Sequence, residues 1–175
     1  MKNSNKILTV ILLSFLGFNA LAADRLYKIE LVIFSQQMPN SEVFDQTESH
    51  IEWPRRLMNR SAYKAVNPQY MSLHGSYARL ARSIDYQPLM HVAWIQSVKP
   101  NSLSSAVKIS NPEGSINGFF RLQRGNLVHM IVDLEYSPGS VIYRLNEKRR
   151  FKLNETHYLD HPKFGMIARI SPIGD

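Results

Sequence analysis

The alternation of apolar and polar side chains between residues 127 and 136 constrains the fold most strongly. Every second side chain from Val128 to Leu134 is apolar, whereas three of the four alternate side chains from His129 to Glu135 are polar. A period of two predicts a β-strand with one face in the core and the other face toward water. Such half-buried strands are typical of antiparallel sheets, because parallel sheets are usually covered on both faces.

Further apolar runs predict that this strand belongs to a larger sheet. The run before it is separated by a short link that contains Gly125, which favours a β-hairpin. The other runs are bounded by Pro, Gly, Ser or Asn, as strands commonly are. The predicted strands, including the hairpin, are 27–34, 89–97, 106–109, 116–123, 127–136, 141–153 and 166–171.

One segment has helical rather than strand periodicity. Apolar residues recur three or four positions apart between residues 72 and 84, at Leu73, Tyr77, Leu80, Ala81 and Ile84. A helix flanked by runs of strands, without strict alternation of the two, indicates the α+β class. We therefore expect a mainly antiparallel β-sheet with one main amphipathic helix packed on a face.

Residues 35–67 are predicted to form a long loop-like region. The segment is polar, contains Pro39 and Pro54, and shows no sustained period, although short helical turns inside it are possible. Loops of this length are uncommon inside compact domains and often carry function. Trp53, in the polar stretch before Pro54, is a candidate for contact with a partner.

The first 22 residues resemble a cleavable signal peptide. Lys2 and Lys6 precede the apolar run 7–18, and Ala20 and Ala22 supply the small residues of a cleavage site. The run is shorter than the roughly 20 residues that a spanning helix needs. We expect an exported, single-domain mature chain of residues 23–175 with no stable membrane insertion. With no cysteine in the chain, the fold can use neither disulfides nor a lipid-modified cysteine.

The charge distribution favours an anionic partner in the cell envelope. The formal net charge is +7, and residues 54–84 contain six Lys or Arg and no acid. A basic face attracts anionic partners through a screened field, although it can also be an ordinary solvated surface. Because an exported chain does not meet the nucleoid, we do not expect nucleic acid to be the partner.

The densest group of polar residues, 149–165, is the predicted ligand-facing region. Arginine can bind carboxylates through two parallel hydrogen bonds, and aromatic side chains can stack on a sugar or a peptide. The candidate ligand-binding residues are Arg149, Arg150, His157, Tyr158, Asp160, His161 and Phe164.

Two other interpretations of this region remain open. His157, Asp160 and His161 could bind zinc, but Pro162 disfavours the helix that would align them, and extended chain would turn Asp160 away. Alternatively, the region is a structural turn. Asp160 would then accept hydrogen bonds from backbone amides, and Gly165 would adopt a left-handed conformation. No catalytic nucleophile motif is present, and neither a cofactor nor a metal is expected.

Three segments together resemble the CsiV family. They are YKIELVIF at 27–34, YQPLMHVAWIQ at 86–96 and RRFKLNETHYLDHPKFG at 149–165. The resemblance implies a non-enzymatic, periplasmic, peptidoglycan-binding accessory factor that supports cell-wall synthesis and cell shape. It also implies a link to a bifunctional penicillin-binding protein and its outer-membrane lipoprotein activator.

Two other functions are compatible with the residues. One is a metal-assisted envelope hydrolase that uses His157, Asp160 and His161. The other is a structural envelope protein that binds protein partners and has no affinity for glycan.

Overall fold

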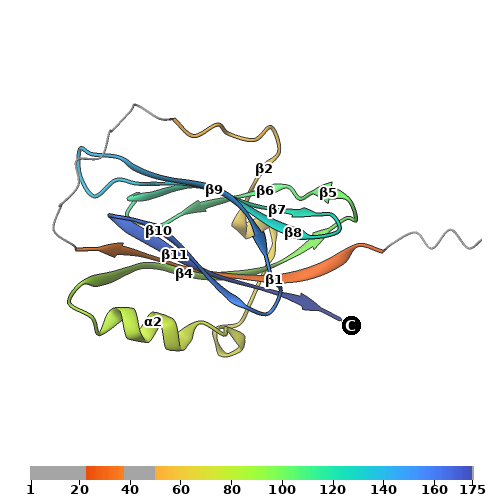
Figure 1. Ribbon diagram of the computed structural model, residues 1–175, viewed down its shortest axis with the longest axis horizontal. Helices are drawn as coiled ribbons and strands as arrows, with labels where there is room; N and C mark the ends of the chain where they lie inside the picture. Colours follow the sequence, from red (N-terminus) through yellow and green to blue (C-terminus); the bar gives the residue numbers. More distant parts are fainter. Residues whose placement is uncertain (1–22, 38–49, 175) are drawn as a thin grey trace, which may run out of the picture.

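Two β-sheets stacked face to face form the body of the protein, and one α-helix lies against the outer side of one sheet (Figure 1). The structure is a computed structural model that describes residues 23–37 and 50–174. The predicted α+β class, mainly antiparallel with a helix on one face, is confirmed. The predicted signal peptide 1–22 lies outside the described residues.

Sheet A is antiparallel throughout and carries the helix. Its central strand is β1, which pairs with β11 on one side and β4 on the other. In spatial order the strands are β10 (Thr156–His161), β11 (Phe164–Ile173), β1 (Arg25–Gln36), β4 (Tyr86–Val98) and β3 (Lys64–Ala65).

Sheet B contains the predicted hairpin and is antiparallel except at one edge, where β2 runs parallel to β6. In spatial order the strands are β2 (Leu57–Asn59), β6 (Ala106–Ser110), β7 (Ile116–Arg124), β8 (Val128–Tyr136) and β9 (Tyr143–Phe151), with β5 (Ser102–Leu103) paired to β7.

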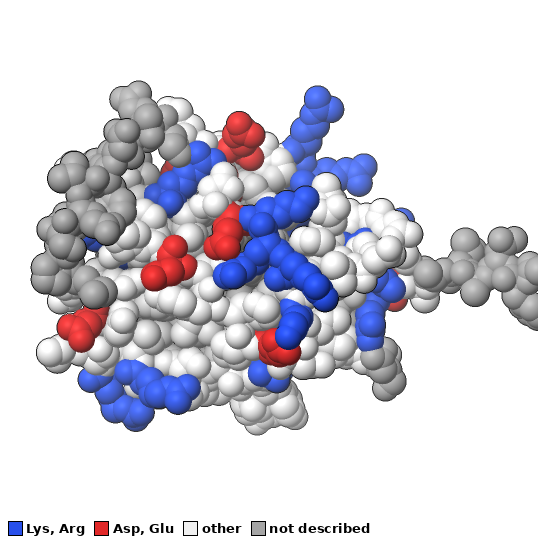
Figure 2. Space-filling model, in the orientation of Figure 1, with Lys and Arg blue, Asp and Glu red and all other residues white. Residues whose placement is uncertain are grey.

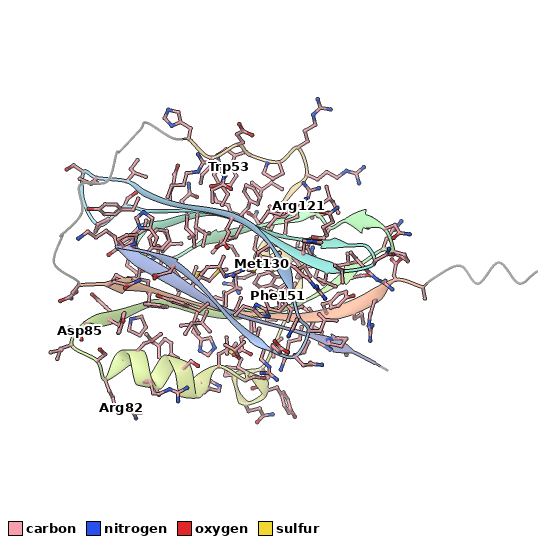
Figure 3. The ribbon with its side chains drawn as sticks, in the orientation of Figure 1. Trp53, Arg82, Asp85, Arg121, Met130 and Phe151 are labelled. Atoms are coloured by element: carbon pink, nitrogen blue, oxygen red, sulfur yellow. The ribbon has the colours of Figure 1, made fainter. Side chains whose placement is uncertain are left out.

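The core lies between the two sheets, and every second residue of the strands points into it, as the sequence predicts. Met130, Val132 and Leu134 of β8 are fully buried, and Figure 3 shows Met130 and Phe151 between the layers. From sheet A, Trp94 packs edge-on against Phe120 of sheet B, with ring centroids 5.5 Å apart. Hydrophobic burial and close packing hold these sheets together without any disulfide.

The predicted helix 72–84 is shorter in the structure, where α2 spans His74–Ala81. Leu73, just before the helix, is buried, but Ile84 is 88% exposed. Ile84 is exposed because the chain has already left the helix and is turning toward β4. The apolar spacing therefore overestimated the helix at its C-terminal end.

The predicted loop-like region 35–67 is only partly irregular. β1 continues to Gln36, and β2 and β3 pair with β6 and β4. The 3-10 helix Arg60–Ala62 lies between these short strands, and a second one, Pro68–Tyr70, follows them. Strands of two or three residues are too short to show a period, and their partners are distant in sequence. Residues 38–49 lie outside the described part.

Gly118→Ala tests the packing of the β7–β8 hairpin. A Cβ at this position would lie 2.1 Å from the Asp133 carbonyl oxygen. The backbone φ here is +150°, a value that residues other than glycine rarely adopt. We expect the substitution to lower the free energy of unfolding by about 2–4 kcal/mol, as measured by urea unfolding.

Gly75→Ala in α2 is the matched control, because an added Cβ would have nothing within 4 Å of it there. It should raise the free energy of unfolding by about 0.5–1 kcal/mol, since alanine is the better helix former. Equal effects of the two substitutions would contradict the role assigned to Gly118.

Candidate functional site

The predicted ligand-binding residues 149–165 begin on β9 and end at β11, and they do not form one site. β9 and β10 are edge strands of different sheets and lie side by side (Figure 1). Arg149 and Arg150 are on β9, whereas His157, Tyr158, Asp160 and His161 are on β10. Because side chains alternate along a strand, neighbouring residues in this group point to opposite sides.

Three contacts join β9 to β10 and close this side of the two-sheet stack; we refer to them as the β9–β10 seam. The Arg149 Nη1 atom donates to the Tyr158 carbonyl oxygen at 3.0 Å. The Phe151 and His157 rings lie 3.9 Å apart, and those of Tyr143 and His161 lie 5.8 Å apart. The histidines predicted to bind a ligand therefore pack between two sheet edges.

Backbone groups satisfy both seam histidines. The His157 Nε2 atom lies 3.2 Å from the Lys152 nitrogen and 3.2 Å from its carbonyl oxygen, and His161 Nδ1 accepts from the Lys163 amide. Burial lowers the pKa of His161, which Lys163 lowers further and Asp160 opposes. A neutral imidazole with Nδ1 as acceptor is consistent with packing in the seam.

Tyr158 and Asp160 lie on the opposite face of β10, on the outer side of sheet A. The Tyr158 hydroxyl and Gln36 Nε2 both donate to Asp160 Oδ1, each at 2.6 Å. Burial, and then the hydrogen bond to Asp160, raise the pKa of Tyr158, so the phenol stays protonated as a donor. The expected turn, in which Asp160 accepts from backbone amides, is replaced by these side-chain bonds.

The metal-site interpretation has no support in this geometry. Asp160 points away from the face that His157 and His161 share, as the alternation of an extended strand requires. Across residues 23–37 and 50–174, no group of three His, Cys, Asp or Glu side chains is placed to hold a metal ion.

Phe164 and Gly165 also differ from their predicted roles. Phe164 is completely buried in the core, so it cannot stack on a ligand. Gly165 is not in a left-handed conformation. A Cβ there would lie 2.7 Å from the Phe34 ring, so this position needs glycine for close packing.

The outer face of sheet B brings together two sequence candidates, Trp53 and Arg150, with residues that sequence reasoning missed. Near its centre, Phe119 and Ile131 pack with Ile51, which belongs to the segment that follows residue 49. The Trp53 ring lies 6.2 Å from that of Phe119 and is 43% exposed. In Figure 3, Trp53 and Arg121 stand on the same outer side of sheet B, away from the core.

Cations occupy two adjacent rows of this face. Arg121, Ile131 and Lys148 form one row across β7, β8 and β9, and Gln123, His129 and Arg150 form the next. Neither row contains an acid. We call Trp53, Arg121, His129, Lys148 and Arg150 the basic–aromatic face.

The side chains of the basic–aromatic face are held to different degrees. Arg121 Nε donates to the Ser104 carbonyl oxygen at 2.7 Å, which fixes the guanidinium, whereas Lys148 and Arg150 are exposed. Figure 2 shows Lys and Arg side chains, with acidic side chains next to them, near the middle of the molecule, where Figure 1 draws β9. The cations of β9 are thus open to a ligand.

Acidic groups of sheet B's outer face lie toward its other end. Asp133 is buried and receives two hydrogen bonds from Arg144, from Nε and Nη2, each of 2.7 Å. The hydrogen bond with Asp133 raises the pKa of Arg144, with burial opposing. Glu52 and Glu135 also act electrostatically on Arg144, so acids outnumber this arginine there, whereas the two rows of the basic–aromatic face carry cations and no acid.

The basic run 54–84 does not form the single face expected from the sequence. Arg55 and Arg56 precede β2 at an edge of sheet B, whereas Arg79 and Arg82 are on or next to α2, beyond sheet A. The chain crosses from one sheet to the other between β2 and β3, so these charges separate.

Glu30 is a buried carboxylate beside a histidine, a pairing often found in catalytic sites. Its oxygens accept from the Ser72 and Leu73 amides at 2.7 Å each, and Oε1 lies 2.9 Å from His91 Nε2. Burial raises the pKa of Glu30, but the hydrogen bonds from His91, Ser72 and Leu73 outweigh burial and lower it overall. With these bonds made, the carboxylate anchors the start of α2 to sheet A.

Comparison with known proteins identifies the family. The family model described as "Peptidoglycan-binding protein, CsiV" matches residues 6–135 and 126–173, which is nearly the whole chain. The chain belongs to the CsiV family. This membership confirms the resemblance seen in the sequence and indicates the cell envelope.

The other two comparisons give no match. No curated protein matches the chain, and no solved structure does. In the part of the chain that the structure describes, no helix is long and apolar enough to cross a membrane.

Glu30→Gln should make stability less dependent on pH. The folded pKa of Glu30 lies below its unfolded value, so its ionised form stabilises the fold above about pH 4.3. That contribution is lost as the pH falls through the folded pKa. At pH 7 the variant should lose about 1–3 kcal/mol of unfolding free energy. On acidification it should lose less additional stability than the unsubstituted protein does, as measured by urea unfolding.

Glu113→Gln is the control for this measurement, since Glu113 is exposed. It should leave the pH profile of stability unchanged. A Glu30→Gln profile parallel to that of the unsubstituted protein would exclude Glu30 as the source of the acid sensitivity.

Arg149→Ala tests the β9–β10 seam, with Arg150→Ala as its neighbour control. Arg149 donates across the seam, whereas Arg150 projects from the other side of β9. We expect a loss of about 0.5–1.5 kcal/mol in unfolding free energy for Arg149→Ala and a change within about 0.5 kcal/mol for Arg150→Ala. A larger loss for Arg150→Ala than for Arg149→Ala would contradict a stabilising role of Arg149 in the seam.

Proposed function

We propose that this protein binds peptidoglycan through the basic–aromatic face and acts as a non-enzymatic accessory factor of cell-wall synthesis in the periplasm, where it supports cell shape. In this proposal, residues 1–22 direct export and are removed, and residues 23–175 form the single mature domain. Membership of a family described as peptidoglycan-binding is the first support.

The observation that carries the proposal is an exposed tryptophan on the same sheet face as three cations whose rows contain no acid. Peptidoglycan consists of N-acetylated sugars that bear short peptides with free carboxylates. An aromatic ring can pack on the apolar side of a sugar, while arginine and lysine bind carboxylates. The basic–aromatic face offers both kinds of contact.

The strength expected of this face suits a polymer better than a small ligand. Each exposed ion pair contributes only about 0.2–1 kcal/mol, so a single peptidoglycan repeat should bind weakly. Many repeats on one sacculus raise the effective concentration and thus the apparent affinity. A binding protein can therefore remain on the wall and still exchange between sites.

Binding is better supported than hydrolysis. Glu30 and His91 bond to each other, and Asp160 bonds to Tyr158 and Gln36. His157 and Asp160 face opposite sides of β10, so the proposed metal-assisted hydrolase would lack a common centre. The buried and paired groups thus have structural partners in this fold.

The resemblance to CsiV proteins supports two protein partners for this accessory role, a bifunctional penicillin-binding protein and its outer-membrane lipoprotein activator. Cross-linking in cells with and without the synthase tests this link. Adducts that contain either partner are expected. Adducts with neither would restrict the proposal to peptidoglycan binding.

Co-sedimentation with isolated sacculi tests the peptidoglycan proposal directly. The protein should pellet with sacculi at about 0.05 M salt and be released progressively toward about 0.5 M, because screening weakens exposed charge contacts. Lys148→Glu with Arg150→Glu should reduce the pelleted fraction strongly at low salt.

Arg79→Glu with Arg82→Glu is the matched control, since it makes the same change in net charge on the helix side of sheet A. It should pellet nearly as well as the unsubstituted protein. Protein that remains in the supernatant at low salt would overturn the proposal and favour an envelope protein without glycan affinity.

A further inference from the structure

We infer that the basic–aromatic face recognises the peptide stems of peptidoglycan through their carboxylates, with the attached sugar on Trp53. This inference rests on the proposed function and specifies which part of the polymer is bound. It depends on where the cations stand, how Arg121 is held and where the acids of the same face lie.

The backbone positions that carry the cations are spread across the sheet. Arg121 and Lys148 are separated by the width of β8, which puts their backbones about 10 Å apart across the sheet. Lys148 and Arg150 are two residues apart on β9, or about 7 Å. The arrangement suits a ligand with several carboxylates spread over a similar span, as in the peptide stem, rather than one small anion.

The sugar chain alone does not match this charge pattern. N-acetylated sugars are uncharged, and the carboxylates of intact peptidoglycan belong to its peptides. Along β7, β8 and β9, the other side chains in the two rows that hold the cations are Ile131, Gln123 and His129, none of which is acidic. A neutral glycan would offer no carboxylate to Arg121, Lys148 and Arg150, whereas a peptide stem would supply several.

Arg121 is prepared for an anionic ligand. It is partly buried, and its Nε is already bonded to the Ser104 carbonyl oxygen. An incoming carboxylate would therefore meet its two terminal nitrogens, in the paired geometry that guanidinium groups favour. Because the side chain is held before binding, less conformational entropy is lost when the ligand arrives.

The two ends of the face give the ligand a direction. Trp53 has Phe119 on one side and is 43% exposed, so it offers an aromatic surface to a sugar. Asp133 is bonded to Arg144, and Glu52 acts electrostatically on the same arginine. These acids therefore lie at the Arg144 end of β9, away from Arg150. Carboxylates are repelled from that end and drawn toward Lys148 and Arg150, which directs the peptide along β9.

The test compares two soluble probes by isothermal titration calorimetry, with protein purified after expression of the full chain. One probe is a disaccharide tetrapeptide muropeptide. The other is N,N′-diacetylchitobiose, a disaccharide of N-acetylated sugars that carries neither peptide nor carboxylate, used at the same concentration of disaccharide. We expect the muropeptide to bind about tenfold more tightly or better.

Substitutions test which residues of the basic–aromatic face contact the peptide and which contact the sugar. Lys148→Glu with Arg150→Glu should weaken muropeptide binding about tenfold, whereas Arg79→Glu with Arg82→Glu should not change it. Trp53→Ala should weaken both probes by a similar factor, because the sugar is common to them. Circular dichroism of each variant separates lost binding from lost folding.

The outcomes separate this inference from the proposed function. Equal affinity for both probes would overturn peptide-stem recognition while leaving peptidoglycan binding in place. Anionic phospholipid vesicles that compete with the muropeptide for the protein as effectively as unlabelled muropeptide does would also overturn it. The face would then respond to negative charge alone. Failure to bind sacculi as well as both probes would remove the proposed function itself.

Discussion

The buried carboxylate of Glu30 determines which sheet the helix covers. It lies at the centre of β1, the middle strand of sheet A, and receives hydrogen bonds from the two amides that precede α2 and from His91. A buried charge is tolerated only when such bonds replace water. With α2 held on sheet A, the outer side of sheet B is left for the segment that carries Trp53 and for the exposed cations of β9.

The two halves of the molecule therefore have different tasks. Sheet A supplies the buried central strand and the helix anchor, where the Glu30 carboxylate is bonded within the fold. Sheet B shares the core through Met130 and Phe120, yet its other side keeps Arg121, Lys148 and Arg150 in rows without acids. A stable layer behind an open charged face is suited to contact with an extended polymer.

The seam between β9 and β10 explains why the richest polar segment of the sequence is not a ligand site. Edge strands expose backbone groups that can pair with other chains, and proteins usually cover them. Here Arg149, His157 and His161 cover the neighbouring edges of two sheets. Residue types that favour ligand binding in a sequence thus serve packing in the structure, because alternation sends their neighbours to other faces.

The amino-acid sequence was sufficient to predict the class of fold, most strands, the hairpin around Gly125 and the resemblance to CsiV proteins, because these depend on local periodicity and on motifs. It did not reveal β10, whose polar residues were read as a turn or a ligand site, or β2 and β3, which are too short to show a period, or the early end of α2 near Ile84. The tertiary structure was needed to bring Trp53 beside Phe119 and to align Arg121 with Lys148, since strand register places residues from distant segments side by side. It also buried Phe164 and separated Arg149 from Arg150, because consecutive side chains on a strand face opposite ways.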